Sequence, residues 1–84
     1  MEAYRTALTR GQLSAQERQG LSLVTRREME VLSLIARGAT NSEIAAEMVI
    51  AETTVKTHVS SLMSKLAARD RVALVLVAQR AGIA

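Results

Sequence analysis

The stretch TTVKTHVSSLMSKL, residues 53–66, decides the fold, because it predicts a helix with two chemically different faces. Apolar side chains recur at helical steps of three and four residues, at Val55, Val59, Leu62, Met63 and Leu66. Short hydroxyls and lysines occupy the opposite face: Thr53, Thr54, Lys56, Thr57, Ser60, Ser61, Ser64 and Lys65. No Asp or Glu occurs in the stretch, although the chain contains 8 acidic residues. We therefore expect a helix over about 52–66 with a buried apolar side and an acid-free outer side.

The composition restricts the chain to one small all-helical domain. It has 84 residues, no cysteine, no proline and a single histidine, and its only aromatic residue is Tyr4. Disulfides and thiolate metal sites are excluded, and one histidine is too few for a histidine-based metal site. An Ala- and Leu-rich chain without proline favours helices around an aliphatic core. We predict an all-α fold, a small four-helix bundle, without metal or other cofactor.

The distribution of charge points to a polyanionic partner. The formal net charge is only +3, but Lys56, Lys65 and Arg69 lie in a window, 53–69, that contains no acidic residue. Acidic residues flank this window on both sides: Glu43, Glu47, Glu52 and Asp70. A basic patch on a nearly neutral surface is typical of nucleic-acid binding. The alternative is a solvated helix face that merely lacks acid.

Capping signals define two helices before this stretch. Thr25 and Glu28 have the spacing of a capping box, and Gly38 ends the apolar periodicity that follows, which predicts a helix over 26–37. Thr40 and Glu43 repeat the signal and predict a short helix over 41–48. The three residues 49–51 are then a tight connection to the helix over 52–66.

The last element, residues 69–80, has a β-rich composition, VALVLV, and fits either a helix or a buried strand. We predict a helix, because no second strand is available for pairing. Asp70 can cap its start and Gly82 can stop it. Its apolar surface is wider than three short helices can cover, which predicts a face for self-association.

The first 20 residues are expected to be a linker or a short helical segment preceding a domain over 21–84. A helix presenting Ala3, Tyr4, Ala7 and Leu8 and ending at Gly11 is one expectation. Ser14 and Glu17 have capping-box spacing, which predicts a short turn before Gly20. No signal peptide is apparent, and the longest apolar run, 72–78, is far shorter than the roughly 20 residues of a membrane span. We expect a soluble, cytoplasmic protein without a membrane partner.

A short helix, a three-residue turn and a longer helix with a basic, hydroxyl-rich outer face form the layout of a helix-turn-helix. The second helix of this motif enters the major groove of DNA. Lysines reach bases or phosphates there, and Ser and Thr hydroxyls bond phosphate oxygens. An acidic side chain would meet phosphates at close range, which accounts for its exclusion from residues 53–66.

Three motifs occur in order and carry a resemblance to a known family: TRREMEVL from residue 25, NSEIA from residue 41 and TVKTH from residue 54. Over residues 21–83 the chain resembles the LuxR/FixJ/NarL DNA-binding domain, also known from GerE. The resemblance implies four helices, the third of which reads the major groove of double-stranded DNA. It also implies a transcription regulator that binds paired half-sites as a dimer through the last helix, 69–80, often behind a receiver or sensor domain.

The family pattern assigns roles to individual residues. It implies base contacts for Lys56, Thr57 and Ser60. It implies phosphate contacts for Thr53, Thr54, Lys65, Asn41 and Ser42. We also expect Arg69 to contact phosphate. Arg69 and Lys65 have a second interpretation, because the C-termini of helices attract cations through the helix dipole. His58 lies near the core edge of its helix, and we interpret it as a packing residue.

The chain departs from the family pattern at three positions. Ala51 stands where Ser or Thr commonly caps the reading helix, and an Ala cap is worth about 1 kcal/mol less. Ala67 replaces the usual Gly after KL, so this turn either carries strain or adopts another conformation. Ser60 is neutral where some members carry a basic residue, which leaves Lys56 as the one cation at the centre of the reading face.

Other functions are less well supported. The sequence contains no nucleophile elbow, and the stretch RGATNSE lacks the lysine of a phosphate-binding loop. We therefore do not expect an enzyme. A dimerisation or adaptor module that acts through protein contacts is the main alternative, and a module like region 4 of a sigma factor is a third. An 84-residue regulator has no room to receive a signal, so we expect a piece of a longer, nucleoid-associated bacterial regulator.

Overall fold

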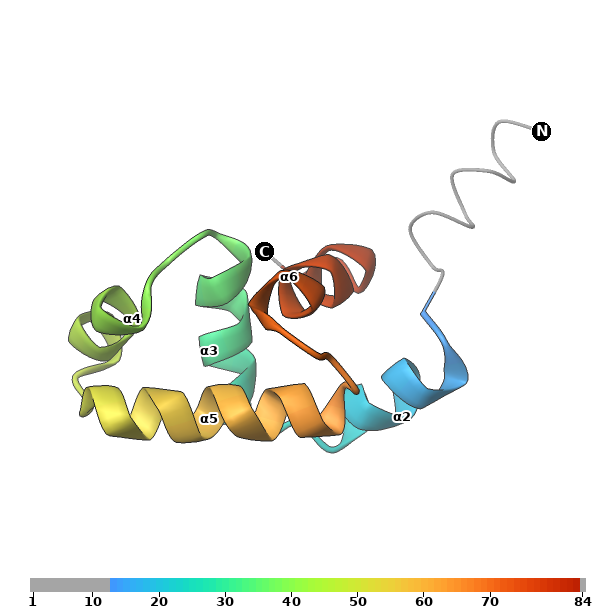
Figure 1. Cartoon of the computed structure of the whole chain (residues 1–84), viewed down its shortest axis with the longest axis horizontal. Coiled ribbons are helices and arrows are strands. Elements are labelled where there is room, and N and C mark those ends of the chain that lie inside the picture. The colour runs from blue at the N-terminus through green and yellow to red at the C-terminus, as the bar shows by residue number, and fades with distance from the viewer. Residues whose placement is uncertain (1–12, 84) are drawn as a thin grey trace.

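The computed structural model describes residues 13–83, and its secondary structure is entirely helical over that range (Figure 1). The helices are α2 (Ala15–Ser22), α3 (Arg26–Ala36), α4 (Asn41–Met48), α5 (Glu52–Lys65) and α6 (Arg71–Arg80). The predicted fold class is confirmed, including the choice of helix over strand for α6. The helix expected around Ala3–Leu8 lies outside the described residues.

Local hydrogen bonds set the starts of these helices. Thr25 accepts a hydrogen bond from the Glu28 N–H at 3.1 Å, and the Glu28 carboxylate accepts one from the Thr25 N–H at 2.9 Å. Equivalent capping boxes begin α2 and α4. Ala51 provides no side-chain cap for α5, as predicted. The start of α6 lies two residues later than predicted, because Asp70 is its N-cap and accepts from the Ala73 N–H.

The core is aliphatic, and α3 lies at its centre. This helix packs against α5 and α6, while α4 packs mainly on the N-terminal half of α5 (Figure 1). The buried apolar residues come from all four of these helices and from Leu66, which directly follows α5: Val31, Leu32, Ile35, Ile44, Val55, Val59, Leu62, Leu66, Leu74, Val77 and Ala78. Within residues 13–83, α3, α4 and α6 thus lie on one side of α5 and leave its opposite side uncovered.

The helix α2 corrects the expectation of a short turn that stops before Gly20. Gly20 lies inside α2 and is buried against the carboxyl end of α5. Glu17 of α2 forms an ion pair with Arg80 of α6, with a Nη2–Oε2 distance of 2.9 Å. Leu21 packs against the core. α2 therefore continues across the boundary expected at residue 20 and is docked on the rest of the domain.

Two non-glycine residues among those described adopt the left-handed backbone conformation. Val49 ends α4 with φ 56°, and Ala67 follows α5 with φ 54°. The Ala68 N–H donates to the Met63 carbonyl at 2.9 Å, the bond that closes a Schellman turn after α5. Of the two alternatives for Ala67, the structure therefore has the strained one, since this conformation costs an L-residue about 1–2 kcal/mol.

Replacing Ala67 with glycine is expected to stabilise the domain by about 1 kcal/mol, because glycine adopts a positive φ without a steric penalty. Ala68 is the matched control, because it is not among the positive-φ residues, and glycine there should destabilise the domain. Urea denaturation followed by circular dichroism compares the two variants. A lower free energy of unfolding for Ala67→Gly would contradict the left-handed turn.

No helix within residues 13–83 has the length and apolar character needed to cross a lipid bilayer.

Candidate nucleic-acid interface

The uncovered side of α5 carries the predicted base-reading residues. Val55, Val59 and Leu62 face the core, whereas Lys56, Thr57 and Ser60 between them are exposed. The structure brings the predicted contact residues of this helix together in one exposed stripe: Thr53, Thr54, Lys56, Thr57 and Ser60. Glu52, the single acidic residue of α5, lies at its first position, where it complements the helix dipole. The stripe itself contains only hydroxyl-bearing residues and one lysine.

The hydroxyl of Thr57 is already oriented by its own helix. It donates a hydrogen bond to the Thr53 carbonyl at 3.1 Å. With its proton directed inward, the hydroxyl presents oxygen lone pairs to the outside. An oxygen that accepts a hydrogen bond can pair with the amino group of an adenine or cytosine base, which is a donor, but not with a phosphate oxygen, which is itself an acceptor.

The carboxylate of Glu28 fixes the inner edge of α5. Lys65 Nζ lies 2.6 Å from Glu28 Oε1, and the Ser61 hydroxyl donates to Glu28 Oε2 at 2.5 Å. Glu28 is 6% exposed and is the one buried charged residue among those described. Its two oxygens therefore join the start of α3 to the second half of α5, which sets the rotation of α5 about its own axis.

The pKa of Glu28 reports how well this carboxylate is compensated. Burial raises the pKa, but hydrogen bonds from Lys65, Ser61 and the Thr25 N–H, together with the charge of Lys65, outweigh burial and lower the pKa from 4.5 to about 2. Glu28 is therefore ionised in the folded chain at every physiological pH.

This contact changes the picture predicted for two residues of α5. Ser61 and Lys65 are directed to Glu28 rather than to the outer face, and the Lys65 side chain is 26% exposed. Its ammonium thus has a structural partner. Lys56 and Arg69 remain exposed and make no ion pair within residues 13–83. Sequence spacing could not reveal the contact, because the partners are 33 and 37 residues apart.

Asn41 and Ser42 lie in the first turn of α4. Ser42 is exposed, and the Asn41 side chain is half-buried. The Asn41 carbonyl oxygen accepts a hydrogen bond from Arg71 of α6 at 2.7 Å, and Arg71 also donates to the Ala39 carbonyl at 2.7 Å. Arg71 is not among the residues predicted from the sequence. The start of α4 is therefore tied to the start of α6.

The helix α6 has a surplus of apolar surface, as predicted. Leu74, Val77 and Ala78 are buried in the core, whereas Val72 is 67% exposed and Leu76 is 51% exposed. The two exposed side chains are four residues apart and so lie on the same side of the helix.

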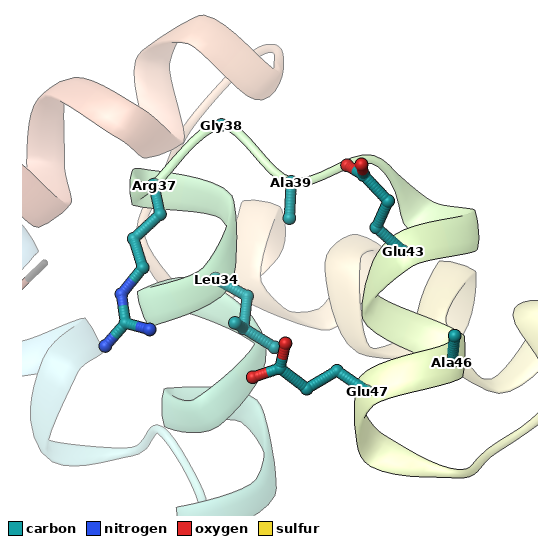
Figure 2. A pocket seen from close by; sticks show the side chains of 7 residues that line it. All are labelled: Leu34, Arg37, Gly38, Ala39, Glu43, Ala46 and Glu47. Carbon is teal, nitrogen blue, oxygen red and sulfur yellow. The ribbon is translucent and has the colours of Figure 1, made fainter.

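A shallow groove of about 740 Å³ lies between α3 and α4 (Figure 2). Figure 2 shows Leu34 at its base and the charged side chains of Arg37, Glu43 and Glu47 around it. None of the predicted contact residues lines this groove. It is thus separate from the exposed stripe of α5.

His58 is half-buried on α5. Within residues 13–83, no group of three or more His, Cys, Asp or Glu side chains is placed to hold a metal ion.

Comparison with known proteins places this geometry in a family. Residues 22–78 match the model of the bacterial regulatory proteins of the luxR family, GerE. An uncharacterized transcriptional regulatory protein, YhcZ of Bacillus subtilis (strain 168), is 50% identical over 62 residues, which cover 74% of this chain and 29% of YhcZ. The response regulator protein VraR of Staphylococcus aureus (strain NCTC 8325) is 52% identical over 56 residues, 67% of this chain and 27% of VraR.

The chain thus spans less than a third of the length of these relatives. The matched region contains α3, α4, α5 and most of α6, and so includes both helices of the helix-turn-helix. The resemblance predicted from the three sequence motifs is confirmed: the chain belongs to the luxR family of bacterial regulatory proteins.

Proposed function

We propose that this chain is the DNA-binding module of a bacterial transcription regulator and that α5 reads the major groove. The observation that carries the proposal is the exposed stripe of α5, where hydroxyls and Lys56 stand free of acid on the second helix of a helix-turn-helix. Family membership and the regulatory names of the relatives support it. The proposed DNA-binding unit is residues 21–84, and the preceding residues of α2 are docked on it.

Each part of the stripe has a proposed task. Lys56 at its centre donates to base edges, and Thr57 and Ser60 contact neighbouring bases. Thr53 and Thr54 donate to phosphates at the amino end of α5. Asn41, Ser42 and Arg69 complete the contacts to the DNA backbone, which position the module without reading sequence. We assign Lys65 to Glu28, because its ammonium is already held there.

We further propose that two copies bind together through α6. Val72 and Leu76 form an exposed apolar surface on this helix. A second copy of the same surface would bury it, and paired modules would recognise paired half-sites.

The relatives suggest the wider setting of this module. VraR is named a response regulator, and its length leaves room for further domains. We propose that this module works together with a receiver or sensor domain, on the chromosome in the bacterial cytoplasm.

Replacing Lys56 with alanine is expected to weaken DNA binding about 10- to 100-fold per module, since a good base contact is worth roughly 1–3 kcal/mol. The probe is a duplex that the wild-type chain selects from a random-sequence pool. Binding is measured by fluorescence anisotropy at several salt concentrations, and sedimentation gives the number of chains per duplex. Wild-type affinity should fall by orders of magnitude between roughly 50 mM and 200 mM salt.

Arg37→Ala is the matched control, because Arg37 is an exposed cation in the groove between α3 and α4, away from the stripe. It should leave affinity nearly unchanged. Absence of salt-dependent DNA binding by the wild type, or equal affinity of wild type and Lys56→Ala, would refute DNA reading by α5. A stable dimer indifferent to DNA would instead favour the adaptor function.

A further inference from the structure

We infer that Arg71, at the start of α6, is a positioning residue that orients the amide of Asn41 so that its nitrogen donates to a DNA phosphate. The inference deepens the proposed function and rests on it. Arg71 itself need not touch DNA. Its contribution is to remove the freedom of a side chain at the edge of the proposed interface.

The guanidinium of Arg71 makes two contacts of equal length. Nη1 donates to Asn41 Oδ1 at 2.7 Å, and Nη2 donates to the Ala39 carbonyl at 2.7 Å. The carbonyl lies on the connection between α3 and α4, and Asn41 is the first residue of α4. A planar fork held at two points cannot rotate, so Arg71 is a rigid support for the Asn41 side chain.

Chemistry fixes which end of the amide Arg71 holds. A guanidinium has donors and no acceptor, so the Asn41 atom bonded to it must be the oxygen. The amide nitrogen is left on the other side and makes no hydrogen bond within residues 13–83. Without Arg71, the amide could turn and present its oxygen to the phosphate, which would repel it.

The position of Arg71 in its own helix supports a role outside that helix. It is the first residue of α6, where the positive end of the helix dipole disfavours a cation. Asp70 already caps this end by accepting from the Ala73 N–H at 2.8 Å. A positive side chain is thus kept at an unfavourable place, and its two bonds to the neighbouring segment account for it.

The same contact links the two proposed surfaces. Val72, the first exposed apolar residue of α6, directly follows Arg71. A second copy docked on α6 would therefore contact the end of α6 that supports Asn41. The proposed dimer surface on α6 and the proposed DNA-backbone contact of α4 lie next to each other in this arrangement.

Four variants test the inference with the duplex selected by the wild type: Arg71→Ala, Asn41→Ala, the double variant and Asn41→Asp. Arg71→Ala should weaken binding about 3- to 10-fold, the loss expected when one side chain must be ordered on binding. In the Asn41→Ala background the same change should have no effect. The salt dependence of Arg71→Ala should equal that of the wild type, because no charged phosphate contact is lost.

Asn41→Asp separates DNA contact from folding. Its carboxylate still accepts from Arg71 and suits the start of α4, so the thermal midpoint should be kept or raised. Binding should nevertheless fall by more than 10-fold, because an acceptor replaces the donor facing the phosphate. Arg69→Ala is the control for loss of an exposed arginine next to α6. Unlike Arg71→Ala, it should lower the salt dependence, as expected for a cation at a phosphate.

Two results with Arg71→Ala would overturn the inference while leaving the proposed function intact. Equal losses from Arg71→Ala in the wild-type and Asn41→Ala backgrounds would show that Arg71 acts independently of Asn41. A salt slope reduced by about one in Arg71→Ala would show a direct phosphate contact by Arg71. Should Arg71→Ala fail to fold, wild-type affinity in Asn41→Asp would be equally decisive against it. Absence of DNA binding by the wild type would instead overturn the proposed function, and the inference with it.

Discussion

Replacing Glu28 with glutamine is expected to lower the free energy of unfolding by about 3 kcal/mol at neutral pH. Glutamine has the shape of a protonated glutamate, so the variant reproduces the wild type with Glu28 uncharged. The pKa of Glu28 falls from 4.5 to about 2 on folding, and each pKa unit corresponds to about 1.4 kcal/mol. Small domains are stable by only about 5–15 kcal/mol, so this loss is a large fraction of the total.

The pH dependence gives a second signature of the same contact. The pKa of Glu28 is lower in the folded chain, so the unfolded chain binds more protons between about pH 5 and pH 2. The stabilisation is therefore complete above the ordinary pKa of glutamate and is lost as the pH falls through this window. Urea denaturation at a series of pH values should show this loss in the wild type and a flatter profile in Glu28→Gln.

Glu43 provides a matched control. Its carboxylate accepts from the Thr40 N–H at 2.8 Å in the same local capping box, but it is exposed and has no partner on another helix among the described residues. Glu43→Gln should cost about 1 kcal/mol or less. Equal losses from the two variants would mean that the ion pair with Lys65 contributes nothing beyond the cap.

The contrast between these glutamates shows which contacts can be predicted from the sequence and which cannot. Both were predicted as capping residues from a spacing of three, and both caps are present. Local spacing predicts them because the hydrogen bonds close within one helical turn. The cross-helix role of Glu28 depends on how α3 and α5 pack, which no local pattern encodes.

The candidate interface likewise contains residues whose positions the sequence predicts and residues whose positions depend on packing between helices. The stripe from Thr53 to Ser60 follows from helical periodicity, and all of its predicted residues are exposed. The periodicity also assigned Lys65 to the outer face, which is wrong in part because a buried carboxylate draws the ammonium inward. Arg71 has a signal in the sequence, because it is a cation near the amino end of a predicted helix, where the helix dipole disfavours it.

The close contact of Gly20 with the backbone of α5 is a further feature that local sequence patterns do not predict. The sequence predicts only a short turn before Gly20, from the capping-box spacing of Ser14 and Glu17. Gly20 is instead the point at which α2 approaches α5. Only the packed arrangement reveals that a side chain is excluded there.

Replacing Gly20 with alanine is expected to destabilise the domain by about 2–4 kcal/mol, the range of severe overpacking. A Cβ atom at this position would lie 1.9 Å from the Lys65 carbonyl oxygen and 2.8 Å from the Lys65 carbonyl carbon. These are backbone atoms at the end of α5 and cannot turn aside. To relieve the overlap, α2 must move away by roughly 1.5 Å, given ordinary contact distances, which also disturbs the pairing of Glu17 with Arg80.

The sign of the change in the free energy of unfolding shows whether α2 is docked on α5. In an isolated helix, alanine is favoured over glycine by about 1 kcal/mol, so a helix that did not touch α5 would be stabilised by the same change. Urea denaturation therefore distinguishes docked from undocked α2 without further assumption. Gln19→Ala is the control, because Gln19 is the preceding, exposed residue of α2 and should accept alanine with little change.

Amide hydrogen exchange shows which helices lose stability in Gly20→Ala. Protection in α2 and at the carboxyl end of α5 should fall in Gly20→Ala, while the core of α3 retains protection up to global unfolding. A stabilised Gly20→Ala variant would show that α2 is independent of the domain. If the predicted loss is found, α2 is held at a fixed place beside the carboxyl end of α5, the proposed reading helix. A partner that displaces α2 would then act on α5 through the contact at Gly20 and on α6 through the ion pair of Glu17 with Arg80.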